Sequence, residues 1–145
     1  MLGDGPLMPE VQQAIIENGL QDRFTLPGWV TPEEVLAWFE RSDILFMPSL
    51  SEGLPVVGVQ ALAKGLALVV SKIGGFVDLV DEGQNGFLVE RQQSHGFSSA
   101  LQGLLSRPDT LQRYREASLQ KAIQFDLKRI VEQYEDIFVE IVQSR

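Results

Sequence analysis

The feature that most constrains this sequence is a regular alternation of short apolar runs with longer amphipathic segments. Three runs are expected to form strands, over Ile44–Met47, Leu66–Ser71 and Gly86–Glu90. The first is continuously apolar and is stopped by Pro48, as is typical of a strand buried on both faces. A shorter β-prone stretch covers Arg23–Leu26. Strands that alternate with helices through short loops predict an α/β fold, a parallel sheet covered by helices on both faces.

The intervening segments have the spacing of amphipathic helices. The clearest start is at Thr31, where Pro32 at the first helical position and Glu34 complete a capping box. Gly19 and Leu20 resemble the C-terminal cap of a first helix. The expected helices run over Leu7–Asn18, from Thr31 onward, about Pro55–Ala63, Phe76–Glu82, Ser94–Leu105, Asp109 to about Ala122, and Leu127–Gln143.

Composition narrows the class of protein. The 145 residues are 44% apolar, which excludes a disordered chain, and they match the size of one domain. The absence of cysteine excludes disulfides, thiolate metal sites and cysteine nucleophiles. A net charge of −8 argues against nucleic acid as a partner. The start has no signal peptide, and Lys64 interrupts the one apolar stretch long enough to suggest a membrane span. We therefore expect a cytoplasmic domain.

Parallel sheets bind ligands at the carboxyl ends of their strands, so the loops that follow Leu26, Met47 and Ser71 are the ones to search. The loop after Met47, residues 48–55, carries Glu52 and Gly53 and leads into a helix. Free N–H groups at a helix start attract anions, and glycine permits close approach to the backbone. The alternative is purely structural: Ser51 and Glu52 cap the helix, and Gly53 shapes a turn.

Residues 51–63, which read SEGLPVVGVQALA, resemble the Glu-x7-Glu segment of the retaining glycosyltransferases of family 4. Other stretches agree in order: 3–6, 24–30, 42–44, 74–78 and 85–89. The likeness extends from Gly3 to about Leu105. It implies a Rossmann-like sheet and, more specifically, the donor-binding half of a two-domain (GT-B) hexosyltransferase.

The resemblance also implies roles for individual residues. Glu52 corresponds to the glutamate that contacts hydroxyls of the donor sugar and is the expected catalytic and substrate-binding carboxylate. Gly53 and Leu54 correspond to positions that present backbone N–H groups to the donor, and Gly75 lies in a second loop beside it. Gln60 replaces the glutamate that binds the ribose, and a glutamine cannot make charge-assisted bonds to two hydroxyls.

Val30 corresponds to the position where the backbone supports the nucleotide base. For the Gly74-Gly75 pair, an ordinary turn that needs positive φ is the competing interpretation. The single histidine, His95, is expected at the surface. The resemblance implies a nucleotide-sugar donor. No Asp, His or Glu spacing suggests a metal site, and no cofactor is expected.

In the family, the donor domain begins with a strand and a loop whose Arg and Lys hold the pyrophosphate. This sequence lacks them, and it lacks the N-terminal acceptor domain, through which any membrane contact is expected. We therefore expect residues 1–145 to be part of a longer protein, with weak donor binding and no transfer activity alone.

The last expected helix has a long apolar stripe at helical spacing. The default interpretation is packing against the sheet, and the alternative is exposure that favours a homo-oligomer through this helix. A non-enzymatic module that binds a nucleotide-sugar or a protein partner is the alternative function. The stripe comprises Leu127, Ile130, Val131, Tyr134, Ile137, Phe138 and Ile141.

Overall fold

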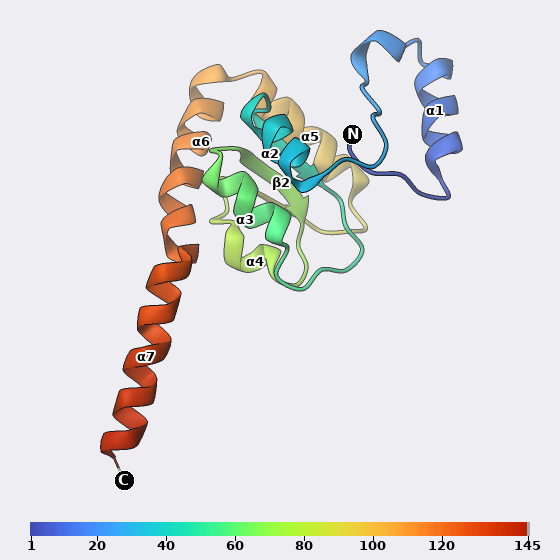
Figure 1. Ribbon diagram of the computed structural model, residues 1–145. Helices are drawn as coiled ribbons and strands as arrows, with labels where there is room; N and C mark the ends of the chain where they lie inside the picture. Colours follow the sequence, from blue (N-terminus) through green and yellow to red (C-terminus); the bar gives the residue numbers. More distant parts are fainter. Residues whose placement is uncertain (145) are drawn as a thin grey trace. The chain divides into compact units, whose positions relative to one another are not determined.

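The computed structural model describes residues 1–144 (Figure 1). They fall into two compact units, Met1–Glu40 and Arg41–Arg145, of which the second contains the sheet.

The first unit consists of two helices and a short 3-10 turn. Helix α1 spans Met8–Glu17, η1 spans Gln21–Arg23, and α2 spans Pro32–Glu40. Gly19 has φ +65°, and the N–H of Leu20 donates to the carbonyl of Ile15, so the expected cap is confirmed. The Thr31 capping box is confirmed too, since Glu34 N–H donates to Thr31 Oγ1 and Thr31 N–H donates to Glu34 Oε2.

The strand expected over Arg23–Leu26 does not form. Arg23 ends η1, and pairing in this region is a single parallel bridge between Leu2 and Gly28. The N–H of Gly3 donates to the carbonyl of Gly28 at 2.8 Å. The amino group of Met1 also donates to the carbonyl of Thr25 at 2.7 Å. A strand needs a ladder of such pairs along its length, and here one isolated bridge forms.

The second unit contains a parallel sheet in the order β1-β2-β3, with β1 at Ile44–Met47, β2 at Ala67–Ser71 and β3 at Gly86–Val89. β2 is the central strand, and all its residues are buried. Within residues 1–144, β1 pairs only with β2, so its other side is an edge of the sheet. Because Ala67 N–H donates to Asp43 O, the parallel ladder turns the backbone groups of Ile44 and Phe46 toward that edge.

Helices cover both faces of this sheet, as the alternation predicts. The helices are α3 (Val56–Ala63), α4 (Phe76–Leu79), α5 (Ser94–Leu105) and α6 (Pro108–Ala122). Ala67 and Val69 of β2 pack in one cluster with Phe97 and Leu104 of α5 and Tyr114 of α6. Leu68 and Val70 alternate with them onto the opposite face and are fully buried.

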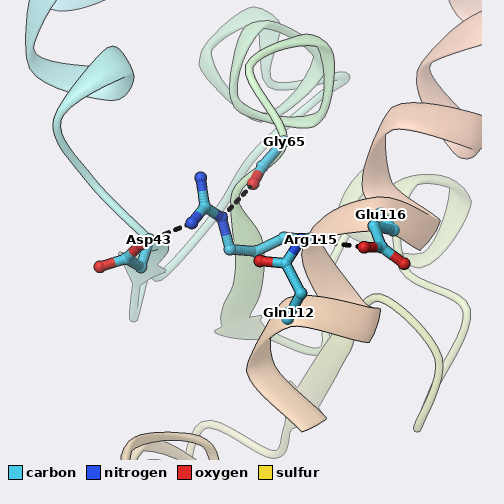
Figure 2. Close-up of polar contacts among 5 residues, drawn as sticks. All are labelled: Asp43, Gly65, Gln112, Arg115 and Glu116. Carbon is cyan, nitrogen blue, oxygen red and sulfur yellow. Dashed lines mark hydrogen bonds and ion pairs between the residues drawn. The ribbon is translucent and has the colours of Figure 1, made fainter. Parts of the chain in front are cut away.

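Helix α6 is fastened to the amino edge of the sheet (Figure 2). Arg115 donates from Nε to the carbonyl of Gly65 at 2.9 Å and from Nη1 to Asp43 at 2.7 Å. One turn further on, the buried hydroxyl of Ser118 donates to the carbonyl of Leu66 at 2.6 Å. These bonds fix where β1 and β2 begin, and so where their carboxyl ends lie.

Helix α4 is shorter than the expected Phe76–Glu82, and Asn85 gives the reason. The buried side chain of Asn85 donates to the carbonyl of Leu79 and accepts from the N–H of Asp81. Val80 is therefore extended, and the helix ends at Leu79.

The last helix, α7, spans Leu127–Gln143 and follows α6 through η2 (Ile123–Phe125). Asp126 caps it by accepting a hydrogen bond from the N–H of Arg129. No described residue of α7 is buried, and Figure 1 shows it leading away from the helices of the second unit. The expected packing of its apolar stripe against the sheet is therefore wrong. Within residues 1–144, no helix is both long and apolar enough to cross a membrane.

Candidate functional site

Two loops meet at the carboxyl edge of the sheet. One follows β1, over residues 48–55, and the other follows β2, over residues 72–75. The N–H of Gly75 donates to the carbonyl of Gly53 at 2.7 Å. The structure thus brings together the loop with Glu52, Gly53 and Leu54 and the loop with Gly75, as the sequence predicted.

The two loops lie so close together that neither Gly74 nor Gly75 has room for a side chain. A Cβ on Gly75 would overlap the carbonyl oxygen of Gly53 and lie 2.7 Å from Leu54 Cα. A Cβ on Gly74 would overlap the carbonyl oxygen of Glu52. Gly74 has φ +41°, which fits the turn interpretation, but Gly75 has φ −68° and needs no special conformation. Backbone contact between the loops is therefore the reason for the second glycine.

Gly53 has no such constraint. A Cβ at this position would have no atom within 4 Å, and its φ is not positive. Glu52 beside it is half-buried, and Leu54 is exposed. Packing therefore does not require a glycine at position 53, and the space at its Cβ position is open.

Helix α3 begins directly after this loop and has no side-chain cap. Pro55 is its first flanking residue and makes no side-chain hydrogen bond to the helix. The interpretation of Ser51 and Glu52 as capping residues is therefore not supported. The N–H groups of the first turn, together with the helix dipole, face the loop with partial positive charge.

Gln60 is half-buried and lies about one turn into α3. The eight-residue offset from Glu52 is therefore only partly helical: four residues of loop and helix cap precede Val56. Glu52 and Gln60 are therefore not separated by two continuous helical turns.

Val30 belongs to the first unit and is half-buried, just before the capping box at Thr31. The neighbouring Trp29 is 81% exposed.

The loop after β1 also borders a pocket of about 340 Å³ next to α5. Its wall is mainly apolar, with Phe46, Pro48 and Phe97, and it includes the polar residues Ser71 and Arg91. The Oγ of Ser71 is buried and has no hydrogen-bond partner among the described residues. The sequence carried no local signal for this unpaired hydroxyl, because it depends on what α5 places over the end of β2.

His95 is exposed at the start of α5, as expected. Over residues 1–144, no cluster of three or more His, Asp or Glu side chains could hold a metal ion.

A parallel α/β domain with a loop-lined carboxyl edge is the class of fold that binds ligands at this edge. The family model described as "Glycosyl transferases group 1" matches residues 1–107. This chain therefore belongs to the group 1 glycosyltransferases.

Among curated relatives, an alpha-D-kanosaminyltransferase from Streptomyces kanamyceticus is 27% identical over 140 residues, which is 96% of this chain and 36% of the relative. The chain thus spans about a third of that protein's length.

Solved structures share the fold. Anabaena Alr3699/HepE, determined in complex with UDP, has a TM-score of 0.84 and 23% identity over 96% of this chain and 40% of its own. The C-terminal domain of LpcC from Francisella tularensis, a group 1 glycosyltransferase, has a TM-score of 0.75 and 22% identity, over 81% of this chain and 61% of that domain.

Proposed function

We propose that this chain forms part of the donor-binding domain of a retaining glycosyltransferase, which moves a sugar from a nucleotide-sugar to an acceptor. The observation that carries the proposal is the contact between Gly53 and Gly75. This contact joins two loops at the carboxyl edge of the sheet, next to a helix start that has no side-chain cap, and the Cβ position of Gly53 stays open. The UDP in the Anabaena structure supports a nucleotide-sugar as the class of donor.

The proposed roles follow from the chemistry of each group. The carboxylate of Glu52 accepts hydrogen bonds from hydroxyls of the donor sugar and orients it. The N–H groups of Gly53, Leu54 and the first turn of α3 face the negative charge of the donor. In transfer, the leaving diphosphate gains charge, and such fixed dipoles stabilise it without rearranging.

Three further residues have supporting roles in this proposal. Gln60 donates one hydrogen bond to the ribose and accepts another. The backbone of Val30 supports the base. Gly75 holds the loop of Glu52 in place through its bond to Gly53.

We infer that residues 1–145 alone are incomplete for catalysis. The chain covers 36% of the kanosaminyltransferase, and the acceptor site is assigned to an N-terminal domain outside these residues. Within residues 1–145, the groups proposed to face the diphosphate are backbone N–H groups, and the net charge of −8 does not favour an anionic donor. We expect weak binding, no transfer by residues 1–145, and a cytoplasmic location, which the absence of cysteine fits.

The test is a titration of the ¹⁵N-labelled chain with UDP and with a UDP-sugar, followed by NMR. We expect the amides of Gly53, Leu54, Val56 and Gly75 to shift, with a dissociation constant of about 1 mM or weaker. Shifts confined to Ser71 and Arg91, or no shifts, would contradict the assigned site. Micromolar binding would contradict the expectation that backbone N–H groups hold the diphosphate only weakly.

A protein-interaction module is the second candidate function, favoured by the exposed apolar stripe of α7. The same titration separates the two candidates, because an interaction module without a donor site gives no shifts at the two loops.

A further inference from the structure

We draw no further inference here: the strongest candidate, the pocket between the end of β1 and α5 that Arg91 and Ser71 line, adjoins the unpaired edge of β1, and nothing in the structure shows whether a ligand or protein outside residues 1–145 covers it.

Discussion

Gly75 and Gly53 are joined by a 2.7 Å hydrogen bond from the N–H of the first to the carbonyl of the second. The bond connects the loops that leave β1 and β2, which are 22 residues apart in sequence at these positions (75 − 53). The two glycines share this contact but have different surroundings, so substitutions can separate folding from binding.

Gly75→Ala is expected to lower the free energy of unfolding by about 1–3 kcal/mol, because the added Cβ overlaps the backbone of Gly53 and Leu54. Gly53→Ala, the matched control, places its Cβ in open space and is expected to change stability by less than about 0.5 kcal/mol. Denaturant unfolding measures both. If the two variants were equally stable, close backbone contact would not be the reason for a glycine at position 75.

Glu52→Gln is expected to reduce the NMR shifts caused by a UDP-sugar and to leave those caused by UDP largely unchanged. The reason is that the proposed partner of Glu52 is the sugar, not the nucleotide. Stability is expected to stay the same, since Glu52 caps no helix. Glu116→Gln on the exposed side of α6 removes the same charge and serves as the control. A parallel loss of UDP shifts would contradict the assignment of Glu52 to the sugar.

Gln60→Glu tests the ribose position. A carboxylate accepts two hydrogen bonds from ribose hydroxyls, and charge-assisted bonds are stronger than neutral ones, so uridine is expected to bind about fivefold more tightly. Uridine is used because it lacks the phosphates that a new negative charge would repel. Unchanged uridine binding would remove Gln60 from the proposed site.

The buried phenol of Tyr114 is expected to make the free energy of unfolding fall at alkaline pH. Burial raises the pKa of its phenol above the ordinary value of 10.0, and the carboxylate of Glu82 raises it further, while Arg113 opposes both. The folded chain keeps the phenol neutral where the unfolded chain ionises. The stabilisation is therefore complete below about pH 10 and is lost as the pH rises through the folded pKa.

Tyr114→Phe is expected to flatten this alkaline loss of stability, measured as the denaturant midpoint at a series of pH values. Glu82→Gln, which removes only the second cause, is expected to flatten it less. If the profile of Tyr114→Phe follows that of the unmodified chain, another group controls the alkaline limit.

Local pattern was enough to predict elements whose signals are local. The bounds of β1, α5 and α7 agree with the sequence prediction, because an apolar run stopped by proline or a periodic stripe with clear ends defines each one. The strand over residues 23–26 failed because pairing needs a partner strand, which composition cannot show. Helix α4 was overestimated because its end depends on the side chain of Asn85, six residues beyond Leu79.

In the candidate site too, some residues could be predicted from local sequence, whereas others depend on contacts with the rest of the fold. Glu52 and Gly53 were found from a motif in one loop. The reason for Gly75 lies in the backbone of the other loop, and no reading of residues 72–76 alone reveals it. The stripe of α7 predicted which side is apolar, but whether that side is covered depends on the rest of the fold.

The position of β1 at the edge of the sheet has a consequence for affinity. The loop with Glu52 is anchored upstream by a strand that is paired on one side only among residues 1–144. Such a strand opens locally at a lower free energy than the central β2, and each opening displaces the loop that carries Glu52, the proposed sugar contact. A polypeptide segment that paired along Ile44 and Phe46 would suppress these openings. It would thereby strengthen ligand binding by raising the fraction of competent molecules, without touching the ligand.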